Sequence, residues 1–174
     1  DEMHGNLDEA IVKIKNDPAY RELFQAAWPA VTDWKSFHIQ NALASYVRSL
    51  VSFNSRFDQY ARGDESKLTE QEKKGFNLFM GKAKCGTCHF MPLFNGTVPP
   101  SFNKIESEVI GVPARGNPGK IDSDSGRYLI YRLEPYLHAF KTTTVRNIAL
   151  TAPYMHNGAF TTLEEVVDFY NKGG

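Results

Sequence analysis

The chain has 174 residues, a mass of 19.6 kDa and a formal net charge of zero, from 20 basic and 20 acidic side chains. This length suits one domain or one and a half, and the balanced charge argues against a nucleic-acid-binding protein. An aromatic content of 13% is too high for a disordered chain. No apolar run approaches the roughly 20 residues needed to span a bilayer. The first five residues do not resemble a leader peptide, so we expect that any leader has been removed.

The N-terminal third predicts two helices. Asp17 followed by Pro18 is a typical helix start, with Asp as the N-cap and Pro at the first helical position. Apolar residues then recur at helical spacing as far as Pro29, at Tyr20, Leu23, Phe24 and Ala27. A longer helix is predicted from Trp34 to about Val51, with Ile39, Leu43, Val47, Leu50 and Val51 on one face.

The rest of the chain predicts two further helices separated by a long irregular region. A capping box at Thr69–Glu72 starts a helix that ends near Gly81. Proline and glycine interrupt every period from Phe90 to about Phe140, as in loops that wrap a cofactor. The last helix begins at Thr161 or Thr162 and ends near Gly173. We expect its inward stripe to contain Leu163, Val166, Val167 and Tyr170.

The two cysteines of the chain lie three positions apart, at Cys85 and Cys88, and His89 follows directly. A zinc site would need two further ligands at matching spacing, and a thioredoxin-like dithiol would need a preceding strand. The adjacent histidine indicates a third chemistry. In a c-type haem site the two thiols bond to the haem vinyl groups and the histidine binds the iron. The motif therefore predicts one covalent haem c.

The sixth position of the iron decides whether the haem transfers electrons or binds small molecules. Met91 is too close to His89 in sequence to reach the opposite face, and Met80 lies on the preceding helix. Three residues farther along the chain are candidates from the residues alone: Met155, His138 and His156.

The C-terminal third resembles bacterial di-haem cytochrome c peroxidases and their MauG-type relatives. The resemblance rests on residues 141–158 (KTTTVRNIALTAPYMHNG) and 163–170 (LEEVVDFY). Shorter matches extend it over nearly the whole chain, at residues 42–51, 75–79, 92–95 and 124–127.

This resemblance implies a particular fold and domain organisation. The fold class is mainly α, a loop-rich c-type cytochrome domain wrapped around one covalent haem. We expect residues 1–64 to form lead-in helices that pack on a C-terminal haem domain at residues 65–174. The family carries a second, N-terminal haem where peroxide is activated, but residues 1–84 contain no CxxCH motif. That haem domain is therefore absent from this chain.

The resemblance also implies site residues. The sixth iron ligand of the family's C-terminal haem is Met in the peroxidases and Tyr in MauG-type enzymes, and the matching residue here is Tyr170. Met155 remains the runner-up. The family binds Ca²⁺ between its two domains, partly through backbone carbonyls that match Thr151 and Pro153. Arg146 is a candidate for a haem propionate, as are Lys141 and His156. The run Asp122–Gly126 lacks the spacing of an EF-hand loop, and we reject it as one.

The predicted function is electron transfer by the haem domain of a periplasmic di-haem peroxidase that reduces hydrogen peroxide or directs its oxidising power at a protein. Expected partners are the N-terminal haem half and either a small redox protein (a cytochrome c or a cupredoxin) or a protein substrate. The alternative is a monohaem cytochrome with His/Met ligation that only carries electrons. A haem-bearing structural module is a third reading.

Overall fold

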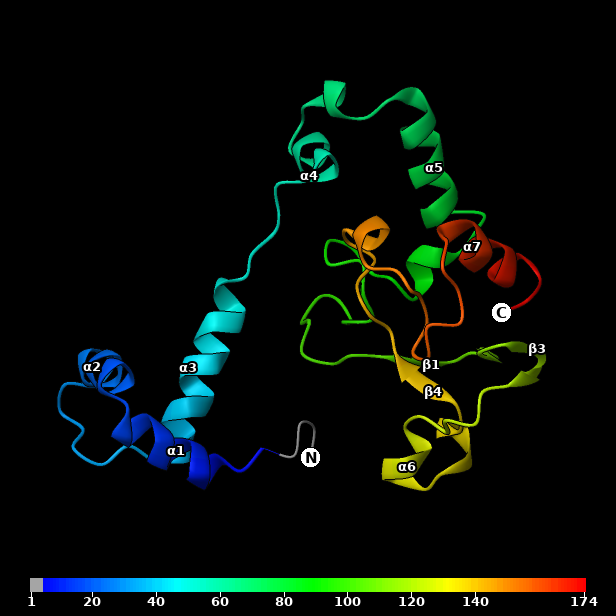
Figure 1. The fold of residues 1–174 in the computed structure, drawn as a ribbon. Helices are drawn as coiled ribbons and strands as arrows, with labels where there is room; N and C mark the ends of the chain where they lie inside the picture. Colours follow the sequence, from blue (N-terminus) through cyan, green and yellow to red (C-terminus); the bar gives the residue numbers. More distant parts are fainter. Residues whose placement is uncertain (1–4) are drawn as a thin grey trace. The chain divides into compact units, whose positions relative to one another are not determined.

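A computed structural model describes residues 5–174, and the chain divides into two compact units, Asp1–Lys67 and Leu68–Gly174. The fold is mainly helical and rich in loops, with a few short strands, which confirms the predicted fold class (Figure 1). Within residues 5–174, no helix is both long and apolar enough to cross a membrane.

The first unit consists of helices whose starts are defined by capping side chains. The α-helices are α1 (Leu7–Asn16), α2 (Pro18–Ala27), α3 (Ser36–Ser49) and α4 (Arg56–Ala61), followed by the 3₁₀ turn η2 (Glu65–Lys67). Asp17 caps α2 as predicted, because its carboxylate accepts hydrogen bonds from the backbone N–H groups of Ala19 and Tyr20. The sequence analysis did not predict α1 or α4. It also placed the end of α3 too late, since Val51 lies beyond that helix.

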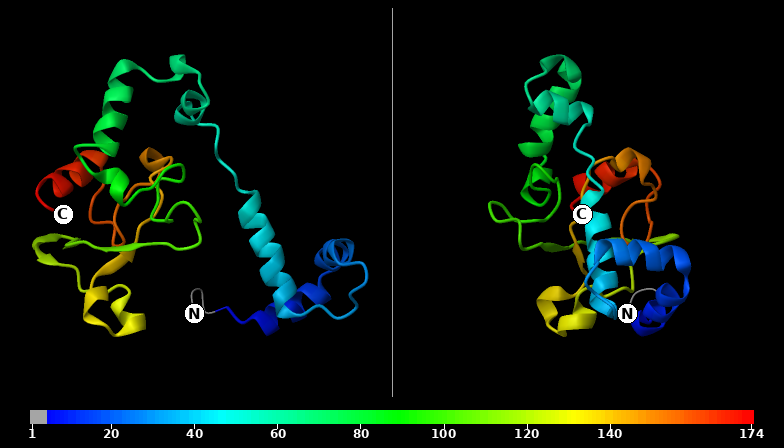
Figure 2. Two further views of the ribbon diagram at one scale, coloured as in Figure 1. Left: turned by 180° about the vertical axis from the view of Figure 1, so that it is seen from behind. Right: turned by 90° about the vertical axis from the view of Figure 1, so that its left-hand side faces the viewer.

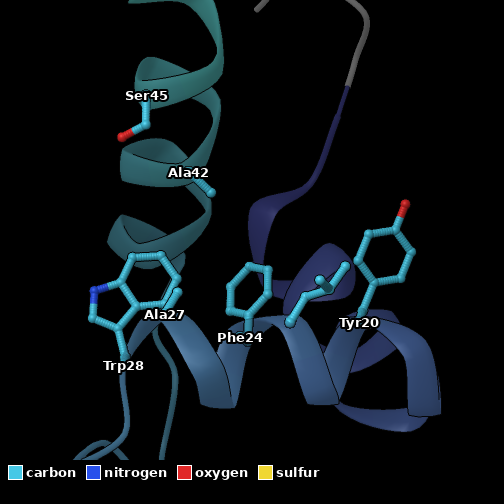
Figure 3. Close-up of a pocket in the computed structure, with 7 residues that line it drawn as sticks. Tyr20, Phe24, Ala27, Trp28, Ala42 and Ser45 are labelled. Atoms are coloured by element: carbon cyan, nitrogen blue, oxygen red, sulfur yellow. The ribbon is translucent and has the colours of Figure 1, made fainter. Parts of the chain in front are cut away.

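The core of the first unit is small and aromatic. Phe24 from α2, Trp34 from the segment before α3 and Ile39 from α3 are buried, and the Phe24 and Trp34 ring centroids lie 5.5 Å apart. Two views show α1 and α2 at the N-terminal end of α3, whose second half extends beyond them (Figures 1 and 2). Of the apolar residues predicted to share one face of α3, only Ile39 is therefore buried. Figure 3 shows the groove beside this core, which is lined from the α2 side and from α3 by Tyr20, Leu23, Phe24, Ala27, Trp28, Ala42 and Ser45.

The second unit has two longer helices with loops between them. These are α5 (Glu70–Met80) and α7 (Leu163–Asn171), and both begin at predicted capping boxes, with Thr69 and Thr162 as N-caps. The short helices are η3 (Cys85–Thr87), α6 (Tyr128–Tyr131), η4 (Glu134–Tyr136) and η5 (Ile148–Leu150).

Two short antiparallel ladders connect the loops of the second unit. One pairs β1 (Ser107–Val109) with β4 (Ala139–Lys141), and the other pairs β2 (Pro113–Ala114) with β3 (Asn117–Ile121). Gly126 lies against the first ladder at a φ of 58°, and a Cβ atom there would be 2.4 Å from the Ala139 carbonyl oxygen. Only glycine fits both the left-handed backbone and this close approach.

The inward stripe predicted for the last helix is partly wrong. Val167 is 65% exposed and Tyr170 is 46% exposed, whereas Leu163, Val166 and Phe169 are partly buried. Phe169 packs against Phe160 with ring centroids 5.3 Å apart. The i, i+3 spacing of these three residues sets the inward side of this nine-residue helix.

Candidate haem site

The two thiols and the adjacent imidazole lie on a single tight turn. Residues Cys85–Thr87 form η3, and the turn is entered through Lys84 in a left-handed conformation with a φ of 59°. The Thr87 hydroxyl donates to the Lys84 carbonyl at 2.6 Å, and the His89 N–H donates to the Cys85 carbonyl at 3.0 Å. These bonds hold Cys85, Cys88 and His89 together as one donor set.

The imidazole of His89 is oriented by the loop that follows it. Its Nδ1 lies 3.2 Å from the carbonyl oxygen of Phe94, so this nitrogen is the natural N–H donor of the ring. The other nitrogen, Nε2, is then the one with a lone pair to bind a metal, and such a carbonyl partner is the usual support for a histidine ligand. Phe79 from α5 packs near both residues, 6.3 Å from the His89 ring and 6.0 Å from the Phe94 ring.

A methionine of the preceding helix packs against the turn. A Cβ atom at Gly86 would lie 2.7 Å from the Sδ atom of Met80. The small residue between the cysteines therefore lets the end of α5 approach the motif closely.

The electrostatic surroundings of the thiols include two carboxylates that the sequence analysis missed. Burial raises the pKa of the Cys88 thiol, and the negative charges of Glu108 and Glu106 raise it further. Both glutamates lie at or beside β1, far from Cys88 in sequence. No local pattern marked them, because only the tertiary structure brings this strand to the motif.

Tyr170 lies within electrostatic range of the cysteine pair. Although Tyr170 is 46% exposed, partial burial of its phenol raises the pKa of that group, and the negative charges of Cys88 and Cys85, when ionised, raise it further, as does that of Glu108. The C-terminal helix α7 thus brings the predicted sixth ligand to the region of the haem motif, although the two are more than 80 positions apart.

A second loop is tied to the loop that follows His89. The guanidinium of Arg146 donates to the Pro92 carbonyl at 3.0 Å, and the Thr144 hydroxyl donates to the Leu93 carbonyl at 2.7 Å. Val145 adds a backbone hydrogen bond to the Phe94 carbonyl at 3.0 Å. Arg146, the predicted propionate partner, is therefore held beside the haem motif.

His156 belongs to a different cluster. Its Nε2 lies 3.3 Å from Asp122 Oδ1, and its ring stacks on Phe140 with centroids 3.7 Å apart. Asn157 donates to the other carboxylate oxygen of Asp122 at 3.1 Å. The pKa of Asp122 is lowered to about 2, first by the Asp124 backbone N–H and then by Asn157 and His156.

The remaining sequence candidates lie in the loops and strand of the second unit that precede α7. His138 Nδ1 lies 2.8 Å from the Asp124 carbonyl oxygen. Met155 has a left-handed backbone with a φ of 68°, and its carbonyl accepts from the Gly158 N–H at 3.3 Å. Thr151 and Pro153 are exposed at the preceding turn, and Lys141 ends β4.

The donor set fits a haem c. Both cysteines are free and partly exposed, so their sulfur atoms are available for thioether bonds, and the adjacent imidazole is oriented with Nε2 free of the Phe94 contact. No cluster of three or more His, Cys, Asp or Glu side chains in residues 5–174 is arranged to hold a metal ion directly. The chemistry available at this turn is therefore that of covalent attachment and axial ligation of a haem.

Comparisons with known proteins agree with this assignment. Residues 1–66 match the sequence model of the family described as di-haem cytochrome c peroxidase. The whole chain is 36% identical to the methylamine utilization protein MauG of Methylorubrum extorquens over 174 residues, which is 46% of that protein. It is also 36% identical to the cytochrome c peroxidase Ccp of Escherichia coli over 161 residues, covering 92% of this chain and 32% of that protein.

The fold has a solved counterpart. The crystal structure of a MauG-like protein associated with microbial copper homeostasis superposes with a TM-score of 0.80 at 34% sequence identity. The match covers 97% of this chain and 50% of the other. The chain thus spans about half the length, or less, of the relatives it matches.

Proposed function

This chain belongs to the di-haem cytochrome c peroxidase and MauG family, and we propose that it is the electron-transferring haem half of a di-haem enzyme that uses hydrogen peroxide. The observation that carries this proposal is the single ordered turn that presents Cys85, Cys88 and the oriented imidazole of His89. The family and this cysteine pair together imply haem c as the cofactor.

Each residue of the site has one role in this proposal. Cys85 and Cys88 form the thioether bonds, and His89 binds the iron through Nε2 while Phe94 holds its Nδ1. When bound, the haem supplies one-electron iron chemistry, whose potential depends on the axial ligands. Tyr170 provides the sixth ligand from α7. Its support is the electrostatic proximity of its phenol to both cysteines.

Two further assignments concern the edge of the site. Arg146 pairs with a haem propionate, supported by its position beside the loop at Pro92. The carbonyl oxygens of Thr151 and Pro153 contribute to a Ca²⁺ site. Both residues are exposed, which suits a site completed by ligands from the other half of the enzyme.

The reaction served is the reduction of hydrogen peroxide to two molecules of water, with two electrons and two protons consumed. This chain has one haem motif and the family is di-haem, so peroxide reacts at the haem of the other half. A tyrosinate ligand lowers the potential relative to methionine, which favours the MauG-type use of peroxide to oxidise a protein side chain.

The partners are the other haem half and either a small redox protein, such as a cytochrome c or a cupredoxin, or a protein substrate. The location is the periplasm, since covalent haem is attached outside the cytoplasm.

The sixth ligand can be tested by three substitutions in the holoprotein. Tyr170→Phe removes the phenol oxygen and should change the optical spectrum of the oxidised haem. Met155→Leu tests the runner-up ligand, and Tyr131→Phe, at an exposed tyrosine at the end of α6, is a matched control. An unchanged spectrum for Tyr170→Phe eliminates Tyr170 as the ligand. A change in Met155→Leu alone would instead indicate His/Met ligation, which is the ligation expected for the alternative of a monohaem electron carrier.

A further inference from the structure

The carboxylate of Asp122, directly after β3, joins two distant segments of the second unit. It contacts His156 and Asn157, which are 34 and 35 positions away and lie in the turn of residues 153–160 that leads into α7. The ring of His156 also stacks on Phe140 of β4. Figures 1 and 2 show the segment between η5 and α7 reaching the ladder of β1 and β4 before it returns to the helix.

Asp122 is itself held in place by the backbone. Its N–H donates to the carbonyl of Val112 at 2.9 Å, and Val112 is buried. Its Oδ1 also accepts from the N–H of Asp124 at 3.0 Å. The side chains of Asp122 and His156 are only 20% and 16% exposed, so water competes weakly for these contacts. Asp122 is therefore a fixed acceptor to which the turn of residues 153–160 is attached.

The same turn contacts α7 near both of its ends. At the start of the helix, the N–H of Tyr154 donates to the carbonyl of Phe160 at 2.7 Å, two residues before the N-cap Thr162. Toward the other end, the ring of Phe160 packs on Phe169 with centroids 5.3 Å apart. The ring of Phe169 lies 5.3 Å from that of Tyr170. The position of the turn is thus passed on to the phenol of Tyr170.

The helix has few other means of fixing its own position. It is nine residues long, which is too short for stability in isolation, and none of these nine residues is fully buried. Its capping box stabilises the first turn of the helix but does not place that turn relative to the rest of the unit. A metal ligand has to be held to within about 0.5 Å of its working position. The attachment of the preceding turn therefore matters for ligation.

We infer that Asp122 is a positioning residue for the sixth iron ligand: by holding Asn157 and His156 it fixes the turn of residues 153–160, and through Phe160 and Phe169 the place of the Tyr170 phenol. This inference rests on the proposed function, which takes Tyr170 to be that ligand. Asp122 acts through α7 and not at the iron.

The test measures how tightly imidazole binds to the oxidised haem of the holoprotein, followed by absorbance. Imidazole binds at the sixth position only when Tyr170 has left it. The apparent Kd is therefore inversely proportional to the fraction of protein in which this position is open. As long as Tyr170 occupies the position in most molecules, a change that weakens its hold lowers the apparent Kd by the same factor.

Asp122→Asn keeps the size of the side chain but replaces one accepting oxygen with a donor. It should lower the apparent Kd for imidazole about tenfold, the effect of losing one hydrogen bond to a charged group. Asn157→Ala removes the other partner of the same contact and should lower the Kd to a similar extent. It also serves as the second variant if Asp122→Asn does not fold. An unchanged Kd in these variants overturns the inference.

Asp124→Asn is the matched control. It makes the same change of charge two residues away, at a carboxylate that accepts from the N–H of Gly126 within its own loop at 2.8 Å. The apparent Kd should stay at the wild-type value. If Asp124→Asn lowers it as much as Asp122→Asn does, the loss of a negative charge explains both effects and the inference is wrong.

A double variant shows whether the effect passes through Tyr170. Tyr170→Phe opens the sixth position and should lower the apparent Kd by itself. Adding Asp122→Asn should then change nothing further, because both substitutions act on the same equilibrium. A further tenfold fall, of the size expected for the single variant, would show that Asp122 shapes the haem site independently of Tyr170, and would refute the inference.

The two single variants also separate this inference from the proposed function. A lowered Kd in Tyr170→Phe together with a wild-type Kd in Asp122→Asn refutes the positioning role and leaves the proposed ligation intact. A wild-type Kd and spectrum in Tyr170→Phe refute the ligation by Tyr170, and the inference with it.

Discussion

Each of the two units of this chain is stabilised internally in a different way. The first unit is built from amphipathic helices around Phe24, Trp34 and Ile39. In the second unit the buried side chains of Phe94, Val112, Ala139 and Tyr154 are spread over separate loops. Backbone hydrogen bonds connect those loops, together with the contacts of His156 and Asn157 to the accepting Asp122 carboxylate and the hydrogen bond that Arg146 donates to Pro92. The comparison teaches that the first unit depends on packing, whereas the second depends on specific contacts around the haem motif.

The largest effect is expected from removing the haem, which should change the thermal unfolding of the second unit but not that of the first. Cys85→Ala combined with Cys88→Ala abolishes covalent attachment, and we expect the second unit to lose its cooperative thermal transition. The first unit should keep its own transition, because its core contains no haem ligand. Both tryptophans, Trp28 and Trp34, lie in the first unit, so tryptophan fluorescence reports on that unit alone. The protease resistance of residues 90–140 reports on the second.

A fluorescence transition that disappears together with the second unit would show that the two units unfold as one, and the comparison would be wrong.

The next effect is confined to the first unit. Phe24→Ala removes the central ring of the core and should lower the free energy of unfolding of this unit by about 3–5 kcal/mol. Leu23→Ala, at a position that is 65% exposed, should change it by less than about 0.5 kcal/mol in the 1–174 chain. Denaturant titration followed by fluorescence measures both, and the haem spectrum should stay the same. Similar costs for the two variants would contradict the assigned core.

A smaller effect is expected in the second unit at Gly126. Gly126→Ala forces a Cβ atom toward the Ala139 carbonyl in a left-handed backbone, and should cost about 2 kcal/mol or more. Gly116 also has a positive φ, of 77°, but has open space around it, so Gly116→Ala should cost only about 1 kcal/mol from backbone strain. Thermal unfolding followed at the haem absorbance compares them. If the two substitutions lower the free energy of unfolding equally, the close approach to Ala139 adds nothing to the cost of Gly126→Ala.

The smallest effect is a pH dependence of stability, to which one aspartate in each unit contributes. Asp122 in the second unit and Asp33 in the first both have pKa values lowered to about 2 from 3.8, Asp33 by its hydrogen bonds to Lys15 and Lys35. A lowered pKa in the folded state stabilises the protein above pH 3.8, and this stabilisation is lost as the pH falls toward about 2.

Asp122→Asn should therefore weaken the pH dependence of the second unit's melting temperature between pH 5 and pH 2, a range of about 3 units set by these pKa values. Asp33→Asn should weaken that of the first unit and leave the haem-monitored transition unchanged. An effect of either variant on the opposite unit would show that the units share their electrostatics.

The sequence predicted those parts of the fold that depend on neighbouring residues. The caps at Asp17, Thr69 and Thr162 placed the starts of three helices correctly, because capping is a contact within one turn. The stripe of α7 was partly wrong, because which side of a short helix turns inward depends on residues such as Phe160 outside it. The packing of residues 1–64 on the haem domain stays a prediction, as do the roles of Tyr170, Arg146, Thr151 and Pro153.

The identity of the haem motif could be read from the spacing of Cys85, Cys88 and His89 alone, since the chemistry of attachment and ligation needs those three residues within one turn. Tertiary structure alone decided what surrounds that turn. It placed the Phe94 carbonyl at Nδ1 of His89 and Glu108 near Cys88. It also brought Tyr170 close enough to both thiols for an electrostatic interaction. It also left half of the apolar stripe on α3 uncovered. Sequence periodicity identifies an apolar face, but only the packing of distant segments determines which part of it is buried.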